Sequence, residues 1–196
     1  MRRSVALAIV LGPMAWGLAA EATRGAPPMD ASLADLRAEA ADNDLVVSFQ
    51  VLYALTPELR ERIAAGLPVT FTHYLEVSRH RLLWFDRTLA RKTVTTTVTY
   101  DTLTRQYKLT KEINDEVAET SVAVSEADMM RWMTDLDRVR LADASILEGA
   151  DDDSLYIRVK SRIQKKFVLL FIPWSVDTGW QRVSVHIPGE PPGLGR

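Results

Sequence analysis

The sequence predicts a mainly β domain, an antiparallel β-sandwich-like sheet structure of about seven strands with two short helices on connections. Apolar and polar residues alternate over short segments, which is the period of a half-buried strand. Turn residues separate these segments at short intervals. No regular alternation of strand-like and helix-like segments is present, as parallel βαβ units would require. These three observations favour packed antiparallel sheets.

The first residues, 1–22, are typical of a secretory signal peptide. Arg2 and Arg3 precede an apolar run over 5–19, and small residues follow up to Ala22. The run is short for a membrane span and contains a Gly-Pro pair, so an uncleaved anchor is the less favoured alternative. We therefore expect export to the periplasm or the extracellular space, with no transmembrane span after signal removal.

The rest of the chain divides into a linker segment, one domain and a tail. Residues 23–42 are expected to be a linker or a marginal helix, because 32–41 is rich in helix formers but short for an isolated helix. A single β-rich domain is predicted over 43–187. The Pro/Gly-rich residues 188–196 are predicted to be a disordered tail.

The first elements of the domain have clear signals. Alternation over 45–53 predicts a strand. A short helix is predicted over 56–66, because a Thr N-cap precedes a Pro and a Gly ends the segment. A second strand follows over 67–78, and its apolar face includes His73, which we expect to be a hydrogen-bonded core residue.

The middle of the chain predicts a hairpin. A Thr-rich strand over 89–100 is followed by a polar turn at 101–104 and a fourth strand that ends near Ile113. Residues 117–124 are too weakly patterned to assign.

A second helix is predicted to begin after Ser125, a capping residue followed by acids, and its apolar stripe should pack on a sheet. A short strand is expected at 138–142. The acidic segment 148–153 is expected to be a solvated loop, since adjacent Asp side chains in a run do not converge on one cation.

A basic strand is predicted over 155–163. Cations share one of its faces and continue beyond it: Arg158, Lys160, Arg162, Lys165 and Lys166. The apolar run 167–174 is too short to span a bilayer and is expected to be a buried strand, with a lipid-dipping loop as the alternative. The last strand is expected over 179–187.

Charge is unevenly distributed along a chain whose net charge is −2. Residues 54–112 are mildly basic, 114–153 strongly acidic and 154–187 basic. One interpretation is that acidic side chains from 115–153 lie beside the basic strand and neutralise it. The other is a basic face for an anionic partner. A weakly acidic exported chain is not expected to bind nucleic acid.

Two clusters are candidates for a partner-binding surface. One is a cationic and aromatic strand end at 79–86, and the other is the hairpin at 100–107. Tyr, Trp and Arg dominate binding hot spots. The candidate contact residues are Arg79, Arg81, Trp84, Asp86, Tyr100, Asp101 and Tyr107.

The sequence contains no recognisable catalytic motif. It has no Cys, no G-x-S-x-G elbow, no H-E-x-x-H and no phosphate loop. The three histidines, His73, His80 and His186, are scattered, and the first two fall on opposite faces of a regular strand. We therefore expect no enzyme activity, no catalytic residue, no metal site and no cofactor.

Together these features resemble a bacterial family of exported domains of unknown function. The resemblance is carried by the signal peptide, Ala65-Gly66-Leu67-Pro68, the Arg79–Asp86 strand end, the Tyr-Asp-x-Leu-Thr-x-x-Tyr hairpin and a late Pro-Trp region. It covers about 43–187, and Ile172-Pro173 stands where the family has Leu-Pro. Members are often encoded beside a sensor kinase and response regulator of the nitrogen-regulation type. The resemblance thus implies an envelope accessory or signalling role.

Two functional hypotheses follow. The first is a non-enzymatic module that binds an envelope protein through the 79–86 and 100–107 clusters. The second is a binder of anionic envelope surfaces, lipid headgroups or glycans, through the basic strand, which includes peripheral contact with an anionic membrane.

Overall fold

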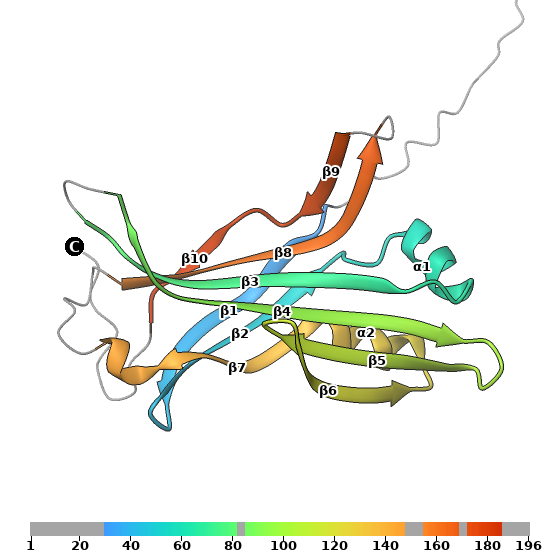
Figure 1. Ribbon diagram of the computed structural model, residues 1–196, viewed down its shortest axis with the longest axis horizontal. Coiled ribbons are helices and arrows are strands. Elements are labelled where there is room, and N and C mark those ends of the chain that lie inside the picture. The colour runs from blue at the N-terminus through green and yellow to red at the C-terminus, as the bar shows by residue number, and fades with distance from the viewer. Residues whose placement is uncertain (1–29, 82–84, 148–154, 169–171, 186–196) are drawn as a thin grey trace, which may run out of the picture.

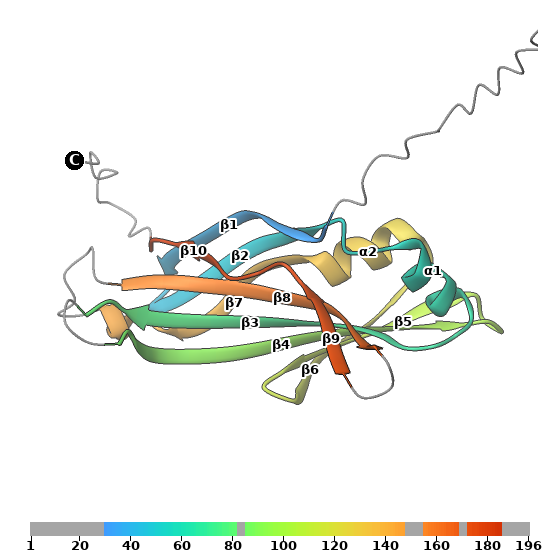
Figure 2. The same cartoon turned by 90° about the horizontal axis from the view of Figure 1, so that it is seen from above.

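Two antiparallel sheets build the domain (Figures 1 and 2). The computed structural model describes residues 30–81, 85–147, 155–168 and 172–185. The smaller sheet has the strand order β1-β2-β7, and the larger has the order β10-β8-β3-β4-β5-β6 with β9 beside β8. This confirms the mainly β, antiparallel prediction with two helices. The described part of the chain forms ten strands, more than the seven expected.

The small sheet consists of β1 (Ser32–Ala41), β2 (Asp44–Leu52) and β7 (Asp135–Asp143). The large sheet consists of β3 (Val69–Arg79), β4 (Arg87–Asp101), β5 (Gln106–Ile113), β6 (Glu116–Ala123), β8 (Leu155–Val168), β9 (Ile172–Asp177) and β10 (Gln181–Val183). The helices are α1 (Pro57–Ala64), α2 (Glu126–Thr134) and the short 3₁₀ helix η1 (Ala144–Leu147).

The hydrophobic core lies between the sheets. It includes Val47 and Phe49 of β2 and Phe71 and Leu75 of β3, all at most 3% exposed. Figure 2 shows the small sheet lying over the large one, with both helices at the same end. Burial of each large apolar side chain contributes about 1.5–3 kcal/mol, so this interface is the main source of stability.

Strand β1 corrects the prediction of a linker or marginal helix over 23–42 for the part that the structure describes, residues 30–42. It pairs antiparallel with β2, and Asp42 and Asn43 connect the two strands with φ angles of 52° and 68°. Two consecutive left-handed residues make the type I′ turn that suits a two-residue hairpin. Leu33 and Ala38 are buried, so strand pairing and burial outweigh the local helix propensity. The folded domain therefore begins before residue 43.

Both predicted helix starts are confirmed. The Thr56 hydroxyl accepts a hydrogen bond from the Leu59 N–H at 3.3 Å, and Gly66 follows the helix with φ 75°. At α2, the Ser125 hydroxyl accepts from the Asp128 N–H at 3.1 Å. Each cap satisfies a donor that the first turn leaves unpaired.

Several strand limits differ from the prediction. The unassigned 117–124 segment forms most of β6, and the short strand expected at 138–142 is the longer β7. The apolar run 167–174 is not one strand, because it supplies the end of β8 and the start of β9. The last strand, expected over 179–187, is the three-residue β10.

Several predicted segments lie outside the described residues: the signal peptide at 1–22, residues 23–29 of the predicted linker, the acidic 148–153 loop and the 188–196 tail. Among the helices of the described ranges, none has the length and apolar character needed to cross a membrane.

Candidate functional site

The two predicted contact clusters lie at opposite ends of the longest strand. Strand β4 has 15 residues, which at about 3.3 Å per residue span about 46 Å. Figure 1 shows the β3–β4 connection at one end of this strand and the β4–β5 turn at the other, beside the helices. The 79–86 and 100–107 clusters therefore form two surfaces, not one.

At the β3–β4 end, Asp86 is the centre of an internal hydrogen-bond network. The Tyr156 hydroxyl donates to its carboxylate at 2.6 Å, and Nδ1 of His80 lies 2.9 Å from the other oxygen. The hydrogen bond from Tyr156 is the main reason that the pKa of Asp86 lies below its usual range, and the Arg81 backbone N–H also contributes. Asp86 thus links His80, just after β3, to Tyr156 of β8.

The other predicted residues of this cluster differ in exposure. Arg79 is half-buried in β3, and within the part of the chain that the structure describes its Nε atom has no hydrogen-bond partner. Arg81 is exposed. Trp84 lies outside the described residues.

At the β4–β5 end, the predicted hairpin is confirmed. Tyr100 and Tyr107 are direct cross-strand partners, and their ring centroids are 4.9 Å apart. The Asp101 carboxylate accepts hydrogen bonds from the backbone N–H groups of Leu103 and Thr104 at 3.0 and 3.1 Å. Asp101 therefore organises the turn, as Asp commonly does at such positions.

Asp101 also pairs with Lys108, whose Nζ lies 2.7 Å from the carboxylate. This hydrogen bond, with those from the turn amides, lowers the pKa of Asp101 to about 2. The carboxylate is ionised at neutral pH and already fully engaged by its own hairpin.

The hairpin forms one wall of a partly apolar groove of about 260 Å³, and the two helices form the others. It is lined by Leu55, Arg60, Ile63, Ala64, Tyr100, Tyr107, Glu126 and Met129. The Arg60–Glu126 ion pair, at 2.8 Å, joins α1 to α2 across it. Sequence reasoning found the two Tyr residues but missed the helix residues, because nothing local indicates that the helices flank this hairpin.

The predicted basic strand is neutralised in part, but by different partners from those expected. Arg158 and Arg91 both bind the buried Glu76 carboxylate with Nε–oxygen distances of 2.7 Å. Nζ of Lys160 lies 3.2 Å from the Asp177 carboxylate. The expectation that acids from 115–153 face these cations is wrong for Arg158 and Lys160, because β3 and β10, not that segment, flank β8 here.

Aromatic rings complete this face. The Trp180 ring centroid lies 4.6 Å from the Arg158 guanidinium and 5.8 Å from the Lys160 ammonium. Such contacts stabilise the cations further. Lys165 and Lys166 occupy β8 opposite Ser175 and Trp174 of β9. Arg158 and Lys160 are thus engaged within the protein, which weakens the case for the whole strand as an anion-binding face.

His73 is a core residue, as predicted. It is 0% exposed, and its Nδ1 lies 2.8 Å from the Ser161 hydroxyl. Its ring meets Phe49 edge-on with centroids 5.5 Å apart. Burial lowers the pKa of His73 to about 3, so the ring is neutral. No group of three or more His, Asp or Glu residues suited to a metal ion occurs in the part of the chain that the structure describes.

These features define a two-sheet antiparallel β domain with distinct surfaces at the two ends of its longest strand. The chain belongs to the family described as Domain of unknown function (DUF4390), whose model matches residues 29–184. That match starts before residue 43, as does the fold. No curated protein and no solved structure matches the chain.

Proposed function

We propose that this protein is an exported, non-enzymatic protein-interaction module, an accessory of the bacterial envelope or of its signalling. Its contact surface is the hairpin surface, defined as Tyr100, Leu103 and Tyr107 with the groove beside them. The observation that carries the proposal is the open, partly apolar groove with a Tyr pair on its wall.

The composition of this surface suits recognition of a protein. Leu103 at the hairpin tip is 94% exposed, while Tyr100 and Tyr107 are half-buried and held against each other. Aromatic side chains fixed before binding lose little entropy when a partner covers them. A partner side chain in the groove would contact Ile63 and Met129, which are already part of the core.

Photo-crosslinking in intact cells tests the hairpin surface. A benzophenone amino acid replaces Leu103 in one variant and Phe85, which is 88% exposed near the opposite end of β4, in another. We expect a discrete protein adduct from position 103 and none from position 85. An adduct from position 85 alone would assign binding to the 79–86 cluster instead and contradict the proposal.

A pair of substitutions tests the role of the Tyr wall. Tyr107→Ala should lower the yield of the adduct at least about tenfold, as truncation of a hot-spot aromatic does. Thr102→Ala, in the exposed turn, should leave it unchanged. Equal adduct yields from both variants would show that the Tyr pair is not part of the contact surface.

Cell fractionation tests export. The full chain should appear in the periplasmic or extracellular fraction, and a variant lacking residues 1–22 should remain in the cytoplasm. Retention of the full chain in the cytoplasm would refute this part of the proposal.

A further inference from the structure

Strands β3 and β8 part from each other at one end, which leaves a strand edge open. Their pairing runs from Arg79↔Leu155 to Thr72↔Arg162. Strand β3 continues to Val69, where it still pairs with β4. Beyond Arg162, the β8 partners are those of β9. Figure 1 shows β8 and β9 curving away from β3 here.

We call this opening the fork. Within the described residues, positions 69–71 of β3 have strand partners on the β4 side and none on the β8 side. An open edge presents backbone N–H and C=O groups that an extended segment can pair with. The fork is therefore shaped to receive one added strand.

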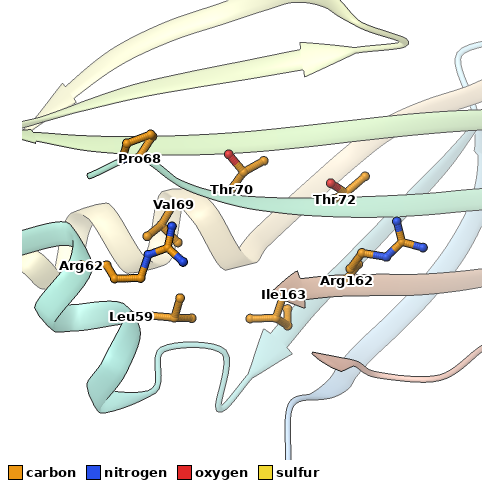
Figure 3. A pocket seen from close by; sticks show the side chains of 8 residues that line it. All are labelled: Leu59, Arg62, Pro68, Val69, Thr70, Thr72, Arg162 and Ile163. Atoms are coloured by element: carbon orange, nitrogen blue, oxygen red, sulfur yellow. The ribbon is translucent and has the colours of Figure 1, made fainter. Parts of the chain in front are cut away.

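A cavity of about 270 Å³ occupies the fork. Figure 3 shows its lining: Leu59, Arg62, Pro68, Val69, Thr70, Thr72, Arg162 and Ile163. The guanidinium groups of Arg62, from α1, and Arg162, from β8, flank it at opposite ends. None of the lining residues carries a carboxylate, so the lining has two cations, two hydroxyls and an apolar floor.

Arg162 is held in place but incompletely satisfied. Its Nη1 donates to the Tyr74 hydroxyl at 2.7 Å, and the guanidinium carbon lies 5.1 Å from the Tyr74 ring centroid. Its Nε atom is buried and has no hydrogen-bond partner among the described residues. A buried donor without an acceptor costs free energy that a bound acceptor recovers.

Arg162 differs from the other two cations on its face of β8 in the partners that it has. Arg158 and Lys160, on the same face, each have a carboxylate partner within the protein. For Arg162 the described residues provide a hydroxyl and a ring instead. Among the described residues, Arg162 thus has no ion pair like those of Arg158 and Lys160, although Asp177 lies opposite it in β9.

We propose that the fork binds an extended acidic peptide segment of a partner protein, which pairs with the edge of β3 and places a carboxylate on Arg162. Arg62 attracts acidic side chains at the other end of the segment. The main-chain pairing selects a peptide over a free anion, and the two arginines select its charge. The inference rests on the proposed function only in that the partner is a protein, because the fork and the hairpin surface share no residue.

A synthetic peptide tests the fork directly. The probe is a seven-residue peptide of alternating Val and Glu with blocked termini, and its control has Lys in place of Glu. Purified protein labelled with ¹⁵N is titrated with each peptide. We expect the Glu peptide to shift the amide signals of residues 69–72, with an affinity that falls as salt rises. Equal shifts from both peptides would overturn the proposal.

Substitutions identify the anion-binding residue. Arg162→Gln should weaken binding of the Glu peptide at least about tenfold, as expected when a charge-assisted hydrogen bond is lost. Arg182→Gln is the matched control, because Arg182 is exposed and stacks on Tyr156 away from the fork. Arg62 lies on the exposed surface of α1, so Arg62→Gln should weaken binding severalfold with no effect on the fold.

The remaining outcomes are also decisive. Unchanged affinity in a folded Arg162→Gln variant would overturn the proposal. Shifts at residues 69–72 caused by inorganic phosphate or phosphatidylglycerol vesicles, with none from the Glu peptide, would replace the peptide with an envelope anion and so overturn it too. Peptide binding without a crosslink from position 103 would support the fork and refute the hairpin surface. A crosslink from position 103 without peptide binding would support the hairpin surface and refute the fork.

Discussion

Single residues in this protein often do a different task from the one their type suggests. Asp86 and Asp101 are acidic, lie near turns and were candidates for partner contact, yet each accepts several hydrogen bonds from its own neighbourhood. The sequence could indicate that these positions are turn-forming, because Asp is favoured there. It could not show that Tyr156 reaches Asp86, because 70 residues separate the two.

Asp101 should make stability depend on pH in the acid range. Its folded-state pKa is about 2, below the ordinary 3.8. The stability that its ionised form contributes is therefore complete above pH 4 and is lost as the pH falls towards 2. Asp101→Ala should unfold at a lower denaturant concentration than the wild type at pH 7, with a smaller difference at pH 2.5. An equal difference at both pH values would contradict the assignment.

His73 should make stability depend on pH in a higher range than Asp101 does, and here too stability should fall as the pH drops. Its folded-state pKa of about 3 lies below the ordinary 6.5, so the unfolded chain takes up a proton that the folded protein does not. The free energy of unfolding should therefore fall as the pH drops below 6.5, by about 1.4 kcal/mol per pH unit from this group. His73→Phe should have a flatter pH dependence between 6 and 4 in urea unfolding. Parallel curves for the two proteins would refute it.

At the scale of helices and strands, residues at the ends of an element predicted the structure better than the composition of the element did. Both helices were predicted because a capping side chain marks each start, and caps act locally. Strand β1 was missed because its residues favour a helix and its burial depends on β2. The Asp42-Asn43 pair carried a usable signal, since Asx residues tolerate left-handed φ angles.

The β1–β2 turn can be tested by a matched pair of substitutions. Asn43 has φ 68°, a conformation that Gly adopts freely and that a β-branched residue adopts only with strain. Asn43→Val should lower the free energy of unfolding by about 1–2 kcal/mol. Asn43→Gly should leave it within about 0.5 kcal/mol. Chemical denaturation at neutral pH measures both, and a tolerated Val would argue against the I′ turn.

At the scale of the whole molecule, the sequence predicted which segments are strands better than which strands meet. Alternation reveals a strand face, but register and neighbour are decided by distant residues. Strand β8 pairs with β3 across more than 70 residues, and the fork combines α1, β3 and β8. The groove and the fork were therefore invisible in the sequence, although Tyr107 and Arg162 were singled out.

Strand β1 should be needed for the whole domain to fold. It covers β2 and approaches β10, where the Gln181 amide donates to the Leu33 carbonyl at 3.4 Å. A chain that starts at residue 43 would expose the β2 edge and the core beneath Leu33. We expect it to lose cooperative thermal unfolding, whereas a chain that starts at residue 30 keeps it. A cooperative transition in the shorter chain would show that β1 is dispensable.

The length of β4 has a thermodynamic consequence. Arg81 and Tyr107 lie near the opposite ends of this strand, which spans about 46 Å. Substitutions that are more than about 10 Å apart and share no partner have additive effects. A double-mutant cycle on the free energy of unfolding, built from Arg81→Ala and Tyr107→Ala, should therefore have a coupling energy within about 0.5 kcal/mol of zero. Each end of the molecule can change in evolution without a compensating change at the other.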